Sequence, residues 1–150
     1  LIASGTGITP FLGYLEEEYN NQKNKLSNDI TGIDNTDSNK INNRFWLIYG
    51  TQNEDTIINK SFLDKCQTLG ICDISYAFSQ HPKIKKTYVQ DILREYKEKI
   101  KNELNYNYAY VRICGSTKMG LSCENELREC LGYKIFDIWK VRNLLVEYWG

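Results

Sequence analysis

The sequence of 150 residues lacks an excess of charge of either sign, because 19 basic and 19 acidic side chains give a formal net charge of zero. A broad surface for nucleic acid or for an anionic membrane needs surplus positive charge, so this balance argues against both partners. No run of about 18 apolar residues is present, so the sequence contains no candidate membrane span. The length suits one domain, which buries roughly 70% of the surface that its unfolded chain exposes.

The sequence also lacks the ligand patterns of a structural metal site. It holds one histidine and five cysteines, and no two cysteines form a C-x-x-C pair. A zinc site is therefore not expected, and no metal ligand is predicted. An odd number of cysteines favours free thiols in a reducing compartment. These residues are His81, Cys66, Cys72, Cys114, Cys123 and Cys130.

The two ends have little of the polar sequence that termini usually carry. The chain opens with an apolar run already under way at Leu1–Ala3, without an initiator methionine or a targeting segment, and it ends with Tyr148 and Trp149 before the last glycine. We therefore expect residues 1–150 to be one domain of a longer polypeptide.

Apolar runs without strict alternation predict buried parallel strands. Helix-like segments lie between these runs, and the alternation predicts an α/β fold with a mostly parallel sheet. The expected strands are Leu1–Ala3, Phe45–Tyr49, Ile74–Phe78, Ala109–Cys114 and Leu144–Trp149. The expected helices are Pro10–Tyr19, Asn59–Leu69, Tyr88–Lys101, Lys118–Leu131 and Lys134–Arg142.

One segment interrupts this alternation. Asn20–Asn43 is dense in Asn, Ser, Thr, Asp and Lys and has few apolar side chains. Such a segment cannot offset its ordering entropy, so we expect a flexible, Asn-rich insertion at residues 20–43. A surface loop that has expanded without acquiring a function is the simplest explanation for it.

A glycine turn follows the first expected strand, in the stretch LIASGTGITPF. Gly5 and Gly7 allow a ligand to approach the backbone closely, and the helix that follows offers free N–H groups to a phosphate. Pro10 stands where the dinucleotide fingerprint has its third glycine, and no Gly-Lys-Ser/Thr follows as in a P-loop. Taken alone, the turn leaves a purely structural role open.

Four motifs in order make the pattern specific. They are SGTGITPF, WLIYGTQNEDTI, YAFSQ with KKTYVQDIL, and VRICGSTKMGLSCENEL, and a terminal aromatic follows them. Together they resemble the NADP(H)-binding domain of the ferredoxin–NADP⁺ reductase family, in particular its diflavin branch, which includes NADPH–cytochrome P450 reductase and the sulfite reductase flavoprotein. The resemblance covers nearly the whole chain except residues 20–43. It implies a three-layer α/β/α sandwich around a five-stranded parallel sheet, which is a Rossmann-like fold.

The resemblance also implies a function. The chain would be the NADPH-binding part of a flavoprotein oxidoreductase in electron transport, and it would position NADPH for hydride transfer to FAD. Covalently linked domains outside residues 1–150 would hold FAD and, in a diflavin protein, FMN, so this chain alone would be inactive. The downstream electron acceptor stays open, as does the host enzyme, because similar modules are fused in pyruvate:NADP⁺ oxidoreductases. A cytoplasmic location, or the cytosolic face of a membrane, is expected.

The resemblance assigns the adenosine 2′-phosphate to the segment after the third expected strand. The matching residues are Ser79, Gln80, Lys86, Tyr88 and Gln90. Ser79 and Lys86 would bind phosphate oxygens, and the Tyr88 ring would stack on adenine; a charge-assisted hydrogen bond contributes on the order of 1.5–3 kcal/mol. Gln80 replaces an arginine common in the family, so other lysines of the segment would compensate. The alternative is a solvated basic turn before a helix.

The remaining site residues follow from the same resemblance. Gly5, Thr6 and Gly7 would bind the pyrophosphate, and Gly115, Ser116 and Met119 would add further cofactor contacts. The catalytic candidates are Cys114, Glu147 and Trp149. Cys114 would lie beside the carbon that gives up hydride, Glu147 would stabilise charge that develops on the nicotinamide, and Trp149 would stack on the flavin. The alternatives are a buried strand cysteine and a strand that simply ends in core residues.

A nucleotide-binding regulatory module that keeps the fold without turnover is the main alternative function. Its support is a set of departures from the family pattern. Gln52 and Asn53 stand where cations are common, Gln80 replaces the arginine, and Ser116 replaces an acidic residue.

Overall fold

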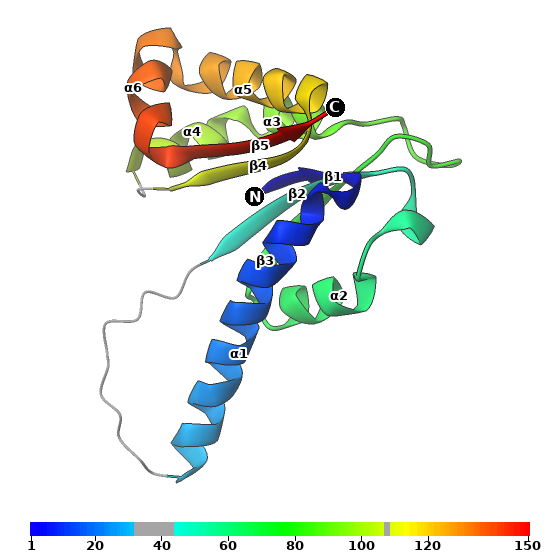
Figure 1. The fold of residues 1–150 in the computed structure, drawn as a ribbon, viewed down its shortest axis with the longest axis vertical. Coiled ribbons are helices and arrows are strands. Elements are labelled where there is room, and N and C mark those ends of the chain that lie inside the picture. The colour runs from blue at the N-terminus through cyan, green and yellow to red at the C-terminus, as the bar shows by residue number, and fades with distance from the viewer. Residues whose placement is uncertain (32–43, 107–108) are drawn as a thin grey trace.

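The computed structural model describes residues 1–31, 44–106 and 109–150 (Figure 1). The strands are β1 (Ile2–Ser4), β2 (Phe45–Thr51), β3 (Cys72–Phe78), β4 (Val111–Ser116) and β5 (Leu144–Trp149). The helices are α1 (Thr9–Thr31), α2 (Lys60–Thr68), α3 (Val89–Glu95), α4 (Lys97–Tyr106), α5 (Thr117–Leu131) and α6 (Tyr133–Asn143). Two short 3₁₀ helices, η1 (Gly5–Ile8) and η2 (Glu54–Thr56), precede α1 and α2.

The five strands form one sheet in the order β3-β2-β1-β4-β5, and every pairing is parallel. β1 lies in the middle, where Ala3 stands opposite Tyr49 of β2 and Cys114 of β4. The chain builds outward from β1 to β3 and then crosses to the other side of β1 at β4. This confirms the predicted α/β fold, and it places the topological switch point between β1 and β4.

Helices cover both faces of the sheet. Successive residues of a strand point to opposite faces, so neighbouring residues pack beneath different helices. On β2, Leu47 and Tyr49 pack in the core beneath α1 and α2, whereas Ile48 packs in the core beneath α3 to α6. Figure 1 shows these two groups of helices on opposite sides of the strands. Burial of both faces explains why the strands are apolar throughout instead of alternating.

Helix α1 is longer than the sequence predicted. Its expected end near Tyr19 is wrong, because α1 continues to Thr31 through the first part of the polar insertion. Gln and Lys, which are present among residues 20–31, favour helix, so a segment with little to bury can still prolong a helix. The 23 residues of α1 span about 35 Å, and Figure 1 shows the helix extending well beyond the sheet. Residues 32–43 of the expected insertion lie outside the described residues.

The single helix expected at Tyr88–Lys101 is also wrong, since the structure has two helices that meet at Tyr96. Tyr96 leaves the α3 geometry with φ of −97° and ψ of 24°, and its ring packs edge-on against Trp46 with 5.6 Å between ring centres.

None of the helices in the described part of the chain has the length and apolar character that a membrane crossing requires.

All five cysteines are buried and free, which confirms the prediction of free thiols. Cys66, Cys72 and Cys114 belong to the core beneath α1 and α2, and Cys123 and Cys130 belong to the core on the opposite face. Burial raises the pKa of the Cys72 thiol and of the Cys123 thiol to about 12. These groups therefore stay protonated at neutral pH and behave as small apolar side chains.

Candidate functional site

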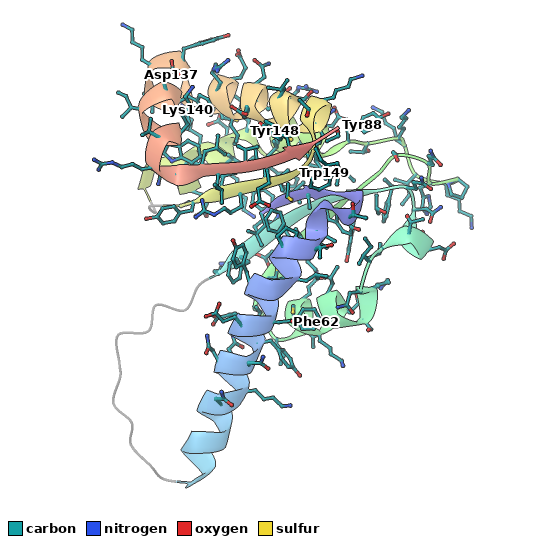
Figure 2. The ribbon with its side chains drawn as sticks, viewed as in Figure 1. Phe62, Tyr88, Asp137, Lys140, Tyr148 and Trp149 are labelled. Carbon is teal, nitrogen blue, oxygen red and sulfur yellow. The ribbon has the colours of Figure 1, made fainter. Side chains whose placement is uncertain are left out.

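The carboxyl ends of the five strands meet at one edge of the sheet, because all the strands run in the same direction. Every predicted site residue lies at the end of a strand or in the segment that follows it. Figure 2 shows Tyr88, which follows β3, and Trp149, the last residue of β5, at the same end of the sheet. Ligands of open α/β sheets bind at this edge, next to the switch point.

The glycine turn lies at the switch point and is closely packed. Gly5 has a φ of 53°, in the left-handed region that strains other residues. A Cβ atom at Gly7 would lie 2.2 Å from the carbonyl oxygen of Cys114 and 2.9 Å from Cη2 of Trp149. The turn continues through η1 into α1 with no acidic residue in either first turn. The amino end of this helix therefore presents positive potential that no acidic side chain of these two first turns cancels.

Tyr49 holds the glycine turn from the neighbouring strand. Its hydroxyl donates a hydrogen bond of 3.1 Å to the carbonyl oxygen of Gly5, and its side chain is fully buried. Burial raises the pKa of Tyr49, so the hydroxyl keeps the proton that it donates. Sequence reasoning missed this residue, because a tyrosine inside an apolar run reads as a core residue.

Strands β4 and β5 bring together the three catalytic candidates. Their register sets Cys114 directly opposite Glu147, and the distance from Cys114 Sγ to Glu147 Oε2 is 3.7 Å. Burial raises the pKa of the Cys114 thiol, and the Glu147 carboxylate raises it further. The thiol is therefore neutral and a poor nucleophile. Trp149 is 44% exposed and lies against Gly7.

The start of α5 is packed against the same edge. A Cβ atom at Gly115 would lie 2.2 Å from Met119 Cε and 2.7 Å from Ser4 Oγ, so a side chain here would require both of these side chains to move. The hydroxyl of Ser116 accepts a hydrogen bond of 3.3 Å from the backbone N–H of Met119 and caps the helix. The structure thus gives Ser116 a local structural role in addition to its position at the site.

Residues 79–88 connect β3 to α3 and form what we call the lysine loop, which carries four predicted residues: Ser79, Gln80, Lys86 and Tyr88. The hydroxyl of Ser79 donates to the carbonyl oxygen of Thr51 at 3.2 Å, so it must rotate before it can donate to a phosphate. The ammonium group of Lys86 lies 5.1 Å from the centre of the Tyr88 ring. Lys86 and Tyr88 are both exposed, as a phosphate ligand and an adenine platform have to be.

Gln90 has different surroundings from the other predicted phosphate-binding residues. It lines a pocket of about 430 Å³ between α3 and α5, together with Arg94 and Glu126. Its Oε1 atom is buried and has no hydrogen-bond partner among the described residues. The structure therefore places Gln90 against α5, in surroundings that the prediction did not include.

The family model described as "Oxidoreductase NAD-binding domain" matches residues 1–124. The chain belongs to this family. The match covers the glycine turn, the lysine loop and the Cys114 segment, whereas β5 lies beyond it.

This oxidoreductase NAD-binding domain is similar to parts of larger proteins. It is 29% identical over 123 residues to NADPH–cytochrome P450 reductase of Saccharomyces cerevisiae, a match that covers 79% of this chain and 16% of that protein. It is 29% identical over 146 residues to the apicoplast ferredoxin–NADP reductase of Plasmodium falciparum, which covers 93% of this chain and 33% of that protein. The resemblance to the ferredoxin–NADP⁺ reductase family is thereby confirmed.

Solved structures agree with this assignment. The structure "Ferredoxin-NADP+ reductase from Plasmodium falciparum with 2'P-AMP" matches this oxidoreductase NAD-binding domain with a TM-score of 0.73 and 26% identity. The match covers 99% of this chain and 51% of that one. The domain therefore spans about half the length of its solved relative and a smaller share of the curated ones.

Proposed function

We propose that residues 1–150 form an NADP(H)-binding domain that binds NADPH and positions it for hydride transfer to FAD. The observation that carries this proposal is the contact at the switch point, where Gly7 meets both the Cys114 carbonyl group and the Trp149 ring. This contact brings the glycine turn, the backbone of Cys114 and an exposed aromatic ring together at one point of the strand-end edge. The nicotinamide, when bound, supplies the hydride, and the residues of this chain bind and orient it.

The glycine turn fits a pyrophosphate. No atom lies within 4 Å of a Cβ atom added at Gly5, so a ligand can approach the backbone there, and the left-handed φ of Gly5 together with the absence of a side chain at Gly7 keeps the turn tight. The N–H groups of Gly5, Thr6 and Gly7 begin the helical turn, where a helix offers unpaired donors and positive potential. We assign these three residues to the pyrophosphate oxygens.

The lysine loop fits a 2′-phosphate. It contains Lys83, Lys85 and Lys86, and no acidic residue stands between Ser79 and Gln90 to bind a ribose 2′-hydroxyl, as an NAD site usually would. The solved relative whose title includes 2'P-AMP carries the same fold. We therefore assign a preference for NADPH, weaker than it would be with an arginine at position 80, because the Gln80 amide carries no charge.

At the end of the site that would hold the nicotinamide, we propose that residues of β4 and β5 determine the shape and the charge of the site. The neutral Cys114 thiol bounds the site without acting as a nucleophile. The Glu147 carboxylate stabilises the positive charge that develops on the nicotinamide ring as hydride departs. Trp149 lies over the glycine turn, and its exposed ring moves aside when the nicotinamide takes its place.

The flavin lies outside this chain in our proposal. Half of the solved relative and most of the yeast reductase have no counterpart in residues 1–150. We assign FAD to a linked domain in the remaining polypeptide, and FMN to a further domain where the host protein is a diflavin reductase. The 150-residue chain is then expected to bind NADP(H) and to show no turnover by itself.

Calorimetric titration of the chain with NADP⁺ and NAD⁺ tests the proposal. The parent chain should bind NADP⁺ more tightly than NAD⁺. Lys86→Ala should weaken NADP⁺ binding by roughly 1–3 kcal/mol and change NAD⁺ binding little, because only the 2′-phosphate loses a partner.

Lys101→Ala is the matched control, because Lys101 is an exposed lysine on α4, away from the strand-end edge. This control should leave both affinities unchanged. Equal affinity of the parent chain for the two nucleotides would overturn the assignment of the lysine loop to a 2′-phosphate.

A further inference from the structure

The charged groups of the lysine loop do not hold the loop in one conformation, so other contacts have to do so. Lys83, Lys85 and Lys86 are all exposed. None of the ion pairs among the described residues includes any of them. Cations of the same sign repel one another, so a loop that presents three of them to one ligand has to be held by its backbone.

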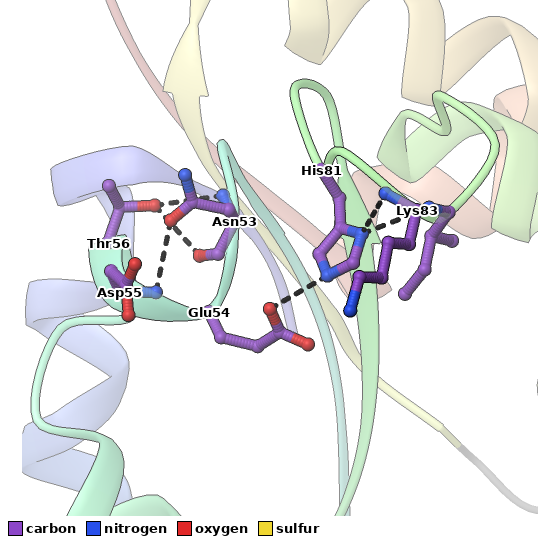
Figure 3. A network of polar contacts seen from close by, with 7 residues as sticks. Asn53, Glu54, Asp55, Thr56, His81 and Lys83 are labelled. Carbon is purple, nitrogen blue, oxygen red and sulfur yellow. Dashed lines mark hydrogen bonds and ion pairs between the residues drawn. The ribbon is translucent and has the colours of Figure 1, made fainter.

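His81 provides this backbone support from within the loop (Figure 3). Its Nδ1 atom accepts hydrogen bonds of 3.0 Å from the backbone N–H groups of both Lys83 and Ile84. The imidazole packs on Phe78 at the end of β3, with 5.5 Å between ring centres, and only 10% of the side chain is exposed. One well-buried ring thus fixes the turn from which the first lysine of the loop projects.

The second ring nitrogen connects His81 to the neighbouring loop. His81 Nε2 lies 2.8 Å from Oε2 of Glu54 in η2. Since Nδ1 accepts two hydrogen bonds, the proton of the neutral ring is on Nε2 and is donated to Glu54. Both ring nitrogens are therefore used within the protein, and His81 has no nitrogen left for a ligand.

The loop after β2 is itself well ordered, so Glu54 is a firm support. Asn53 Oδ1 accepts a hydrogen bond of 3.0 Å from the backbone N–H of Asp55, and the Thr56 hydroxyl donates to the Asn53 carbonyl oxygen at 2.9 Å. Figure 3 shows this capped turn facing His81 across the gap between the two loops. The backbone N–H of Gln80 also donates to the Gln52 carbonyl oxygen at 2.9 Å.

We propose that His81 is a positioning residue that sets the lysine loop for the 2′-phosphate and so determines selectivity for NADPH over NADH. This inference rests on the proposed function. His81 acts through the backbone of Lys83 and Ile84 and touches no part of the cofactor. The contribution of His81 matters because Gln80 supplies no cation. Recognition of the 2′-phosphate therefore depends on the lysines of the loop, and the loop backbone determines where these lysines lie.

The test compares two substitutions at His81 by calorimetry with NADP⁺ and NAD⁺. His81→Phe keeps a ring to pack on Phe78 but removes all three polar contacts, and it should weaken NADP⁺ binding five- to tenfold while leaving NAD⁺ binding unchanged. His81→Asn should recover at least half of the lost selectivity. An asparagine side-chain oxygen accepts hydrogen bonds from the same following N–H groups in an Asx turn.

Amide hydrogen exchange of the nucleotide-free chain gives a second readout. The N–H groups of Lys83 and Ile84 should be protected in the parent chain and in His81→Asn, and they should exchange at least tenfold faster in His81→Phe. Glu54→Gln keeps an oxygen that can accept from Nε2, so it should change both the exchange rates and the selectivity less than His81→Phe does.

The outcomes separate this inference from the proposed function. A parent chain without NADP⁺ preference overturns the proposed function and, with it, any role of His81 in selectivity. A parent chain that prefers NADP⁺, together with a His81→Phe variant that keeps the same NADP⁺ to NAD⁺ ratio, overturns the inference alone. This includes the case in which His81→Phe loses both affinities equally, because a general structural defect does not distinguish the two nucleotides.

Discussion

The two halves of the strand-end edge are built in different ways. Around β1, β4 and β5 the packing is so close that a Cβ atom at Gly7 would overlap a backbone carbonyl group, and one at Gly115 would overlap the side chains of Met119 and Ser4. Around β2 and β3 the loops are open to solvent, and hydrogen bonds such as those of His81 hold them in place. In the first half, close packing determines which atoms fit. In the second half, the main feature is the charge on a loop that hydrogen bonds hold in place.

This difference separates two kinds of sensitivity. Added atoms in the packed half have nowhere to go, because protein interiors are as dense as organic crystals. Exposed cations in the open half contribute little to stability, since surface substitutions usually change the free energy of unfolding by less than about 0.5 kcal/mol. Substitutions in the packed half should therefore lower stability, whereas those in the lysine loop should alter nucleotide binding with the fold intact.

The largest expected effect comes from Gly7→Ala. The new methyl group would lie 2.2 Å from a backbone carbonyl oxygen that cannot move freely, so we expect a loss of about 3 kcal/mol in the free energy of unfolding. Chemical denaturation measures it. Gly13→Ala in α1 is the control, because no atom lies within 4 Å of its added Cβ, and it should stabilise the chain by about 0.5–1 kcal/mol. A Gly7→Ala variant as stable as the parent would contradict the packing difference.

A smaller effect is expected where the two halves are connected. Tyr49→Phe removes the hydrogen bond to the Gly5 carbonyl oxygen and should cost about 1 kcal/mol of stability. Tyr76→Phe is the matched control. The Tyr76 hydroxyl is buried without a partner among the described residues, so its removal should be neutral or stabilising. Thermal unfolding of both variants checks the pair, and equal losses would show that Tyr49 does not support the turn.

The smallest expected effect concerns the reactivity of Cys114. The Glu147 carboxylate is one cause of the raised pKa of this thiol, so Glu147→Gln should lower the pKa and increase the thiolate fraction at a given pH. Alkylation of Cys114 at pH 8 should become about threefold faster, and its pH profile should move to lower pH. Mass spectrometry of labelled peptides gives the rate.

The remaining cysteines and Glu17→Gln, which changes an exposed carboxylate on α1, serve as controls for that experiment. Neither the other four labelling rates nor the rate in Glu17→Gln should change. If Cys114 reacts at the parent rate in Glu147→Gln, the thiol and the carboxylate are not coupled as their distance indicates.

The sheet could be predicted because burial on two faces leaves a simple pattern. Runs such as Phe45–Tyr49 became β2 with a small extension, and the run before the terminus became β5 over the expected range. The meeting of the glycine turn, Cys114 and Glu147 at one edge also follows from parallel strands, since all their carboxyl ends lie together.

Other features depend on contacts between distant parts of the chain, which no local sequence pattern predicts. The sequence carries no sign that His81 reaches Glu54, or that the ring of Trp149 covers Gly7. The end of α1 was missed because polar residues tolerate both helix and loop, and propensity alone does not decide between them. Whether the predicted site residues bind a cofactor stays a prediction.

The strand order also has a consequence for the time at which the sheet is completed. β1 pairs with β4 through Ile2 and Ile113, about 110 positions apart in the chain. At a synthesis rate of about 5–20 residues per second, β1 emerges roughly 5–20 s before its second neighbour exists. Once β3 has also emerged, and until β4 follows 33 positions later (from Phe78 to Val111), β1 is the open edge of a three-stranded sheet, with unpaired backbone groups that invite association with other chains. Slow translation between β3 and β4 would therefore lengthen the period in which the nascent chain is exposed to aggregation.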